Sequence, residues 1–296
     1  MPELPEVETV RRGLTSLIIG RSVTAVVHDT PKSFPNDPQS VASFMVGATV
    51  TEVRRRAKVL MIDVSTNYTV VIHLKMTGQL VFVDDKTRFG AGHPNDSLVG
   101  ILPDKSTRVT IEFTDGSRLF FNDQRKFGWM KLLPTDAVPL MDFMIKVGPE
   151  PLNDDFTPSQ FAARFTRRAN TSIKAALLDQ SVVAGVGNIY ADESLWGAKI
   201  HPKRLVKTIT AGEFKHLYTE LRFVMNLAIE KGGSSNQNYV NAEGKKGSYM
   251  DFARVFRREG LECPRCGTVI IKFKAAGRGT HICPQCQQLS GILETL

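Results

Sequence analysis

The chain begins Met1-Pro2-Glu3-Leu4-Pro5-Glu6, and this stretch decides how the N-terminal part starts to fold. Proline is favoured in the first turn of a helix, and acidic residues are favoured near the positive end of the helix dipole. The apolar residues that follow recur at helical spacing, and a glycine ends the pattern: Val7, Val10, Leu14, Leu17 and Gly20. We therefore expect a helix between Pro5 and Gly20.

The same opening is also typical of a nucleophile. Initiator methionine is normally removed before a small residue, which would leave Pro2 with a secondary amine. An α-amino group titrates at roughly 7.7–8, so it is partly unprotonated near neutrality and can condense with an aldehyde-type carbon to give an iminium. Glu3 and Glu6 place carboxylates close enough to move protons around it. A purely structural helix start explains Pro5 and Glu6 equally well, so both interpretations stay open here.

Length and charge narrow the class of protein. The 296 residues suggest two domains with a third, small module. The formal net charge of +8 points to a polyanionic partner, most simply nucleic acid. The chain start is acidic and lacks an apolar run, and no stretch approaches the roughly 18 apolar residues that span a bilayer. We therefore expect a cytoplasmic protein with no membrane partner.

Beyond Gly20 the pattern changes to short segments rich in Val, Ile, Phe and Thr, most of them separated by Gly, Pro, Asn and Asp. Eight strands are expected, at residues 22–28, 48–54, 59–64, 69–74, 79–83, 108–113, 118–122 and 128–132. They predict a β-sandwich or barrel that ends near residue 135. Residues 84–106 are predicted to form a long polar loop.

The second half of the chain is helical. Four prolines between residues 133 and 151 indicate a linker, and Thr157-Pro158 is a typical helix start. Further helices are expected at residues 172–178, 189–196 and 211–231. The whole pattern predicts an α+β fold.

All four cysteines lie near the C-terminus, as two C-x2-C pairs separated by sixteen residues: Cys263, Cys266, Cys283 and Cys286. This spacing is typical of a zinc ribbon or finger. Disulfides are disfavoured in a reducing compartment. Because four thiolates close the coordination shell, we expect one structural zinc ion.

Three further segments place basic residues beside apolar ones. The run Arg54-Arg55-Arg56-Ala57-Lys58 is either a solvated edge strand or a phosphate grip that directs Lys58 at a reaction centre. Met76, on a glycine turn, is either core filler or a wedge for a vacated base position. Arg125 and Phe127 share another loop, where Arg can bond a base edge and Phe can enter the stack. A simple hairpin turn that packs Phe127 on the core is the alternative.

Two glycine-rich turns complete the candidates. Gly185-Val186-Gly187-Asn188 precedes an expected helix, where backbone N–H groups can hold a phosphate. Many helical connections need glycine for geometry alone, so this signal is weak. Gly277-Arg278-Gly279-Thr280 lies between the two cysteine pairs and would expose Arg278, which fits a DNA contact better than packing.

Taken together, these motifs resemble the formamidopyrimidine-DNA glycosylase family, bacterial enzymes that remove oxidised purines. The resemblance runs from Pro2 to about Gln288 and is most specific in the opening residues, in Gly-Val-Gly-Asn-Ile-Tyr-Ala-Asp-Glu at 185–193 and in the cysteine module. It implies a catalytic sandwich at 2–135, a linker at 136–151, a helix–two-turn–helix domain at 152–250 and a zinc finger at 254–288.

The resemblance also implies roles for individual residues. Pro2 would be the Schiff-base nucleophile, Glu3 a general acid–base, and Lys58 and Arg278 the residues that assist β- and δ-elimination. Six further residues would contact DNA: Met76, Arg125 and Phe127 in the gap left by the flipped nucleotide, Lys174 and Asn188 on phosphates, and Tyr239 in a loop over the extruded base. Double-stranded DNA would be the partner of a monomer with no obligate protein partner.

The sequence departs from the family in places. Gln124 and Lys126 replace the proline and second arginine of the usual Asp-Pro-Arg-Arg-Phe-Gly, and Ser106 stands where a DNA-contacting histidine is common. An endonuclease VIII-type enzyme for oxidised pyrimidines is the first alternative, but that branch usually has glycine where Leu4 stands. The second is a non-catalytic zinc-finger DNA-binding protein, which would have no use for an N-terminal proline.

Overall fold

The computed structural model describes residues 1–28, 31–93, 95–234 and 249–289. The chain forms two compact units. Unit 1 comprises residues 1–145 and the segment that begins at Ala228, and unit 2 comprises residues 146–227 and the segment that begins at Tyr249. Tyr239, expected in a DNA-contacting loop, lies outside the described residues.

Unit 1 is a β-sandwich with one long helix, α1 (Leu4–Ile18). In the described ranges it holds nine strands in two sheets, and every neighbouring pair is antiparallel. The first sheet has the order β1 (Val23–His28), β7 (Thr107–Phe113), β8 (Arg118–Asp123), β5 (Gly78–Val83), β6 (Arg88–Gly92). The second has the order β2 (Val50–Arg56), β3 (Val59–Val64), β4 (Tyr68–His73), β9 (Trp129–Pro134).

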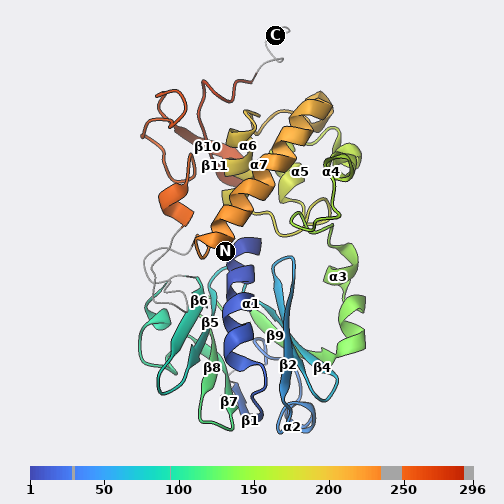
Figure 1. The fold of residues 1–296 in the computed structure, drawn as a ribbon, viewed down its shortest axis with the longest axis vertical. Coiled ribbons are helices and arrows are strands. Elements are labelled where there is room, and N and C mark those ends of the chain that lie inside the picture. Colours follow the sequence, from blue (N-terminus) through green and yellow to red (C-terminus); the bar gives the residue numbers. More distant parts are fainter. Residues whose placement is uncertain (29–30, 94, 235–248, 290–296) are drawn as a thin grey trace. The chain divides into compact units, whose positions relative to one another are not determined.

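Helix α1 lies along the side of the sandwich where both sheets end. It contacts the edge strands β2 and β6, and Figure 1 shows it between them. Its buried residues Val7, Val10, Leu14 and Ile18 repeat at helical spacing and join the core between the sheets. The helix therefore covers apolar edges that would otherwise face solvent.

Strand β3 is buried along its whole length because both of its faces are covered. Leu60, Ile62 and Val64 face the core between the sheets. Val59 and Met61 face a second cluster that includes Val138. The remaining short helices of this part are α2 (Pro38–Phe44), η1 (Asp96–Leu98), η2 (Thr135–Leu140) and α3 (Asp142–Lys146).

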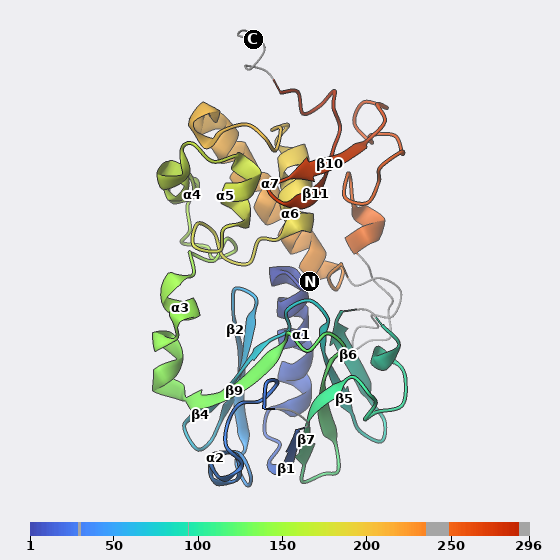
Figure 2. The same cartoon turned by 180° about the vertical axis from the view of Figure 1, so that it is seen from behind.

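All eight expected strands are present, as two separate sheets rather than a barrel (Figure 2). The prediction of an uninterrupted loop at 84–106 was wrong, because β6 lies within it and pairs with β5. Gly90 and Gly92 obscured the strand pattern. A Cβ on Gly92 would lie 2.5 Å from the Gly78 carbonyl oxygen, so close strand approach requires glycine there.

Unit 2 combines helices with a metal-finger hairpin. Its helices are α4 (Pro158–Phe165), η3 (Thr166–Arg168), α5 (Ile173–Leu178), α6 (Asn188–Gly197), η4 (Val206–Thr208), α7 (Ala211–Glu230) and η5 (Tyr249–Phe252), with α7 continuing into unit 1. The hairpin is β10 (Ile271–Ala275) and β11 (Arg278–Ile282), and α6 contacts both α5 and β11. No helix in the described ranges is long and apolar enough to cross a membrane.

Candidate active site

The N-terminus of α1 places a proline beside two buried acids. Pro2 is buried, and Glu3 and Glu6 are 3% and 4% exposed. Glu6 Oε2 accepts a hydrogen bond from Glu3 N at 2.8 Å, and its Oε1 accepts one from Ser234 N, also at 2.8 Å. Glu6 is thus a helix cap, as the structural interpretation expected, and it also fixes the backbone next to Pro2.

Lys58 lies at the turn between β2 and β3, after Ala57, whose φ is +52°. It is only 6% exposed, so most of its side chain is removed from solvent. Figure 1 shows the tip of the β2–β3 hairpin at the same end of unit 1 as the start of α1. The fold therefore places two buried residues, Lys58 and Pro2, at the same end of the sandwich.

His73, which the sequence analysis did not single out, belongs to this region. Burial lowers the pKa of its imidazole to about 3, with further lowering by the positive charges of Lys75 and Lys58. Its neutral Nδ1 accepts a hydrogen bond from Lys75 N at 3.0 Å. The sequence signal that could have identified His73 was its place at the end of an expected strand, with Lys75 two residues later.

Two arginines of the basic run are engaged inside unit 1. Arg54 forms a two-point ion pair with Asp63, and Arg55 Nε lies 3.1 Å from Glu8 Oε2. Burial raises the pKa of Glu8, but hydrogen bonds from Arg11 and Arg12 and the charges of Arg11 and Arg55 outweigh burial and lower it to about 2. Arg55 Nη1 also donates to the Ala57 carbonyl at 3.0 Å. The run therefore supports the turn that carries Lys58.

The loops of Met76 and of Arg125 and Phe127 are joined by one carboxylate, Asp123, which is 1% exposed. Asp123 Oδ1 accepts hydrogen bonds from the Thr77 hydroxyl and from Arg125 N, and Oδ2 accepts one from Gly128 N at 2.6 Å. The structure thus unites the two loops that were predicted separately. Asp123 and Thr77 were missed, because their contact spans 46 residues of sequence.

The tip of this double loop is exposed. Phe127 is 46% exposed and does not pack on the sandwich core, so the simple core-capping alternative was wrong. The Arg125 guanidinium lies 4.8 Å from the centre of the Phe127 ring. An exposed aromatic ring with a cation stacked on it is well suited to a nucleic-acid base.

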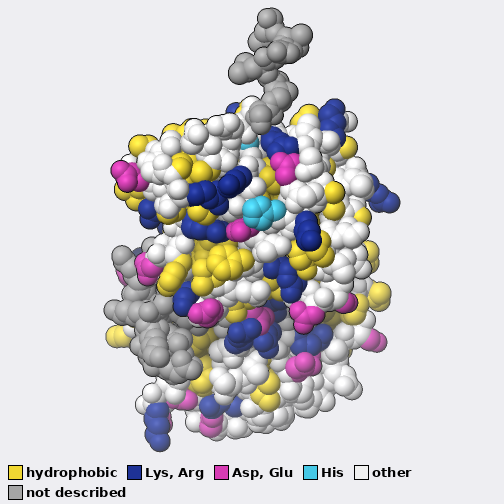
Figure 3. All heavy atoms as spheres, turned by 45° about the horizontal axis from the view of Figure 1, so that its top comes forward, with side chains coloured by type: hydrophobic (Ala, Val, Ile, Leu, Met, Phe, Trp, Pro, Cys, Tyr) yellow, Lys and Arg dark blue, Asp and Glu magenta, His cyan; other side chains and the backbone are white. Residues whose placement is uncertain are grey.

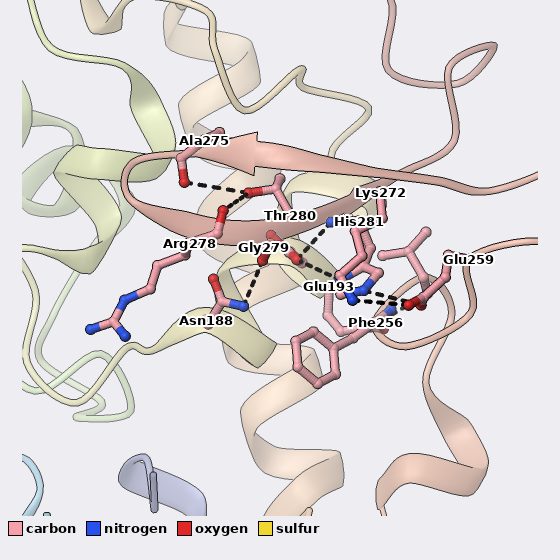
Figure 4. A network of polar contacts seen from close by, with 12 residues as sticks. Asn188, Glu193, Phe256, Glu259, Lys272, Ala275, Arg278, Gly279, Thr280 and His281 are labelled. Atoms are coloured by element: carbon pink, nitrogen blue, oxygen red, sulfur yellow. Dashed lines mark hydrogen bonds and ion pairs between the residues drawn. The ribbon is translucent and has the colours of Figure 1, made fainter. Parts of the chain in front are cut away.

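In unit 2, the glycine turn and the finger hairpin meet. The side chain of Gln180 accepts from Gly185 N and donates to the Val186 carbonyl, which shapes the turn before α6. Asn188, the first residue of α6, donates from Nδ2 to the Gly279 carbonyl at 2.9 Å. Arg278, exposed and adjacent to Gly279, therefore lies beside the N-terminus of α6 (Figure 4).

Lys174 does not present its charge at the surface. It is 0% exposed, and its Nζ lies 2.6 Å from Asp192 Oδ1 and 2.7 Å from Thr280 Oγ1. The phosphate contact that the resemblance implies for Lys174 would require this buried ion pair to open. Its helical neighbours are apolar, and only the fold reveals partners 18 and 106 residues away.

The four cysteines form a compact cluster. All four Sγ atoms lie within 4.8 Å of one another, and the closest pairs are 3.4, 3.5 and 4.0 Å apart. These separations exclude disulfide bonds, which need about 2.05 Å. Tetrahedral ligation with metal–sulfur bonds of about 2.3 Å separates the sulfurs by roughly 3.8 Å. The donor set therefore fits a structural metal ion, with no ligand position left for catalysis.

Positive charge is dispersed on the face of the molecule that Figure 3 draws. On the face drawn in Figure 3, Lys and Arg side chains alternate with acidic and hydrophobic ones. The charge of +8 therefore acts as a general attraction for a polyanion, and the loops described above must supply the specific contacts.

The fold and these sites define a DNA-binding protein of the helix–two-turn–helix and zinc-finger class. Family models match along most of the chain: the formamidopyrimidine-DNA glycosylase N-terminal domain over residues 1–130, its H2TH domain over 147–239, and the zinc finger found in FPG and IleRS over 260–289.

Whole-chain relatives agree with these matches. The formamidopyrimidine-DNA glycosylase of Streptococcus pyogenes is 40% identical over 97% of this chain and 99% of its own. That of Pediococcus pentosaceus is 42% identical over 98% of this chain and 100% of its own. The chain belongs to the formamidopyrimidine-DNA glycosylase family, as the sequence resemblance predicted.

Solved structures with this fold hold damaged DNA. A Lactococcus lactis FPG mutant bound to Fapy-dG DNA has a TM-score of 0.85 at 34% identity, with 97% of this chain and 100% of that chain covered. MutM bound to carbocyclic 8-oxo-G DNA has a TM-score of 0.82, with the same identity and coverage. The chain is thus an enzyme, a DNA glycosylase with lyase activity at apurinic or apyrimidinic sites.

Proposed function

We propose that the protein excises 8-oxoguanine and formamidopyrimidines from double-stranded DNA and cuts the strand at the vacated site by β,δ-elimination. The observation that carries the proposal is a buried proline beside two buried carboxylates at the start of α1. Solved structures of related proteins bound to Fapy-dG DNA and to carbocyclic 8-oxo-G DNA support the substrate class.

Removal of Met1 would give Pro2 a secondary amine. Its lone pair attacks the anomeric carbon of the damaged nucleotide, and the bond to the base breaks with its electron pair on the base. The departing base takes up a proton. Loss of the Pro2 N–H proton and opening of the sugar ring then give the iminium. Glu3, 3% exposed and next in sequence, is placed to carry protons in these steps.

The iminium drives the eliminations that follow. It withdraws electrons from the sugar, so a proton on the neighbouring carbon becomes acidic and the 3′ phosphate leaves with the electron pair. A second elimination releases the 5′ phosphate. We assign Lys58 to the first elimination because of its buried position at the sandwich end. Arg278, exposed on the finger hairpin, would neutralise the phosphate that leaves in the second.

Extrusion of the damaged nucleotide costs roughly a few kcal/mol, which contacts in the duplex must offset. Met76, Arg125 and Phe127 would fill the gap and contact the orphaned base, as the exposed double loop allows. Asn188 and the backbone N–H groups at the start of α6 would hold a phosphate. Tyr239 stays a predicted contact to the extruded base.

The metal ion is proposed to be zinc, because four thiolates at tetrahedral spacing match its preference. We further propose that the enzyme is cytoplasmic and acts as a monomer without an obligate protein partner. A single lesion has no twofold symmetry for a dimer to match. Metal analysis by atomic emission and a light-scattering mass of the purified protein test the ion and the monomer.

Borohydride trapping tests the proposed reaction. With an 8-oxoguanine duplex, the purified enzyme is expected to form a covalent adduct through Pro2, and intact mass should show a chain without Met1. Pro2→Gly, which replaces the secondary amine with a primary one, is expected to trap more slowly. Stronger trapping on a thymine glycol duplex would identify an endonuclease VIII-type enzyme instead. No adduct on either duplex would identify a DNA-binding protein without this chemistry.

A further inference from the structure

Helix α6 carries two adjacent acids that the proposed chemistry does not use. Asp192 is 1% exposed and Glu193 is 0% exposed. Burying a carboxylate is costly unless hydrogen bonds or an opposite charge compensate. Both compensations are present: hydrogen bonds connect α6 to the finger module, and an ion pair connects it to Lys174 of α5.

Glu193 holds the chain where it enters the finger. Its carboxylate accepts hydrogen bonds from the consecutive amides of Arg254, Val255 and Phe256, at 2.8–2.9 Å for the shortest contact of each. The Tyr249 hydroxyl donates to it at 3.1 Å. Glu193 thus fixes the base of the module.

Asp192 holds the hairpin itself. Its Oδ2 accepts from His281 N at 2.9 Å and lies 3.2 Å from His281 Nδ1, while its Oδ1 pairs with Lys174 Nζ at 2.6 Å. The other ring nitrogen of His281 lies 3.2 Å from Glu259 Oε2. One carboxylate on α6 therefore joins α5 to β11.

The connection continues to the backbone of Arg278 (Figure 4). Thr280 Oγ1 accepts from Lys174 Nζ at 2.7 Å. It lies 3.2 Å from the Arg278 carbonyl and 3.5 Å from the Ala275 carbonyl, and the nearer of these can accept its one proton. Asn188 binds the next carbonyl, that of Gly279, from the start of α6. The Gly279 carbonyl is thus held directly from α6, and the Arg278 carbonyl is held through Thr280, which Lys174 of α5 contacts.

The side chain of Arg278 has no such support. No hydrogen bond or ion pair joins its guanidinium to another described residue, and Figure 4 shows it extending away from the network. It follows a two-residue turn in which Ala276 and Gly277 have φ of +50° and +70°. The position of the guanidinium therefore depends on how firmly its backbone is held.

We propose that the buried chain of contacts Asp192–Lys174–Thr280 is a positioning device for Arg278. It fixes the hairpin backbone so that the guanidinium reaches the leaving phosphate in one orientation. This proposal rests on the role of Arg278 in δ-elimination given above. It assigns Lys174 to positioning through Thr280 rather than to direct contact with DNA.

Thr280 offers the sharpest test because its hydroxyl contacts Lys174 Nζ and lies within hydrogen-bond distance of the Arg278 carbonyl. Thr280→Val removes the hydroxyl and keeps the shape, whereas Thr280→Ser keeps the hydroxyl. In single-turnover reactions of the full-length metal-loaded enzyme on 8-oxoguanine duplex, Thr280→Val should lower the ratio of δ- to β-elimination ends about fivefold. Base release should stay within about twofold, and Thr280→Ser should restore the parent ratio.

A second measurement is independent of the reaction. Hydrogen exchange of the peptide that covers residues 275–282, in DNA-free enzyme, should accelerate in Thr280→Val and match the parent in Thr280→Ser. Metal content equal to the parent shows that the finger is intact. Should Thr280→Val fail to fold, the charge-neutral double variant Lys174→Met/Asp192→Asn takes its place, with the same expected changes.

The outcomes distinguish failure of the positioning device from failure of the proposed role of Arg278 in δ-elimination. Unchanged exchange in Thr280→Val overturns the positioning device, whatever Arg278 does. Faster exchange with an unchanged end ratio also overturns it, provided that Arg278→Ala lowers the ratio. If Arg278→Ala leaves the ratio unchanged, the catalytic role of Arg278 fails, and with it the functional consequence proposed for the device.

Discussion

At the scale of single residues, the surroundings of the His73 imidazole make the stability of the fold depend on pH. Its pKa falls from an ordinary 6.5 to about 3, because burial and the charges of Lys75 and Lys58 disfavour the proton. The folded state therefore binds fewer protons than the unfolded chain between these values. The stability this provides is present above pH 6.5 and is lost as the pH falls toward 3.

We expect the parent enzyme to lose about 1.5 kcal/mol more than His73→Asn between pH 6.5 and pH 5. Asparagine has no proton to gain in this range, and its Oδ1 can accept the hydrogen bond of Lys75 N. Urea unfolding of both proteins at several pH values measures the difference. Parallel stability curves for the two proteins would show that His73 does not titrate as described.

Glu6 is a second residue with a measurable effect. Its two oxygens accept from Glu3 N and Ser234 N, and glutamine can accept through only one of its two polar atoms. We expect Glu6→Gln to lower stability by about 1–3 kcal/mol and to slow borohydride trapping, because the backbone beside Pro2 loosens. Thermal unfolding and trapping rates measure both. Asp37→Asn, at a distant helix start, serves as a control that should leave trapping unchanged.

At the scale of elements, Asp123 joins the loop of Met76 to the loop of Arg125 and Phe127 by hydrogen bonds. Removal of its carboxylate leaves the Thr77 hydroxyl and Gly128 N without this acceptor, while Arg125 N can still donate to Thr77 Oγ1, 3.2 Å away. We expect Asp123→Ala to weaken binding to an abasic-site duplex about tenfold, because the gap-filling residues lose their fixed positions. Fluorescence anisotropy measures the affinity. Gln124→Ala, an exposed neighbour, should change it less than twofold, and equal losses in both variants would contradict the role of Asp123.

The elements also show what the sequence can predict. Alternation and turn residues located eight strands, and helical spacing located α1 and α7, because these signals are local. The pairing order, with β1 beside β7 and β4 beside β9, depends on how the sheets bury their faces and has no local signal. Glycines hid β6 for the same reason, since close approach to β5 is a property of the fold.

In the candidate site, too, features with a local sequence signal were predicted, and features that depend on distant partners were not. Cysteine spacing identified a metal cluster that the structure bears out, and the opening motif identified the family. The roles of Asp123, Asp192 and Glu193 were not visible, because their partners lie far away in sequence. The sequence hinted at these roles only by placing Asp192 and Glu193 between apolar residues of the expected helix, such as Tyr190 and Leu195.

At the scale of the whole molecule, each unit has its own core, and each contains one of the two tryptophans. Trp129 of unit 1 packs with Val59 and Met61. Trp196 of unit 2 packs with Cys263 and Cys283, two of the metal ligands. Each tryptophan therefore reports on its own unit, and variants that keep only one of them separate the two signals.

We expect metal removal to disrupt the finger and leave the sandwich folded. In Trp129→Phe, addition of a strong chelator should shift the emission of Trp196 to longer wavelength, because loss of the metal exposes the cluster around it. In Trp196→Phe, the emission of Trp129 should stay constant, since all four cysteines lie in unit 2 and Trp129 packs in a cluster of unit 1. Strand cutting should be lost together with the Trp196 shift, and added zinc should restore both. A chelator response of Trp129 equal to that of Trp196 would show that the units do not keep independent cores.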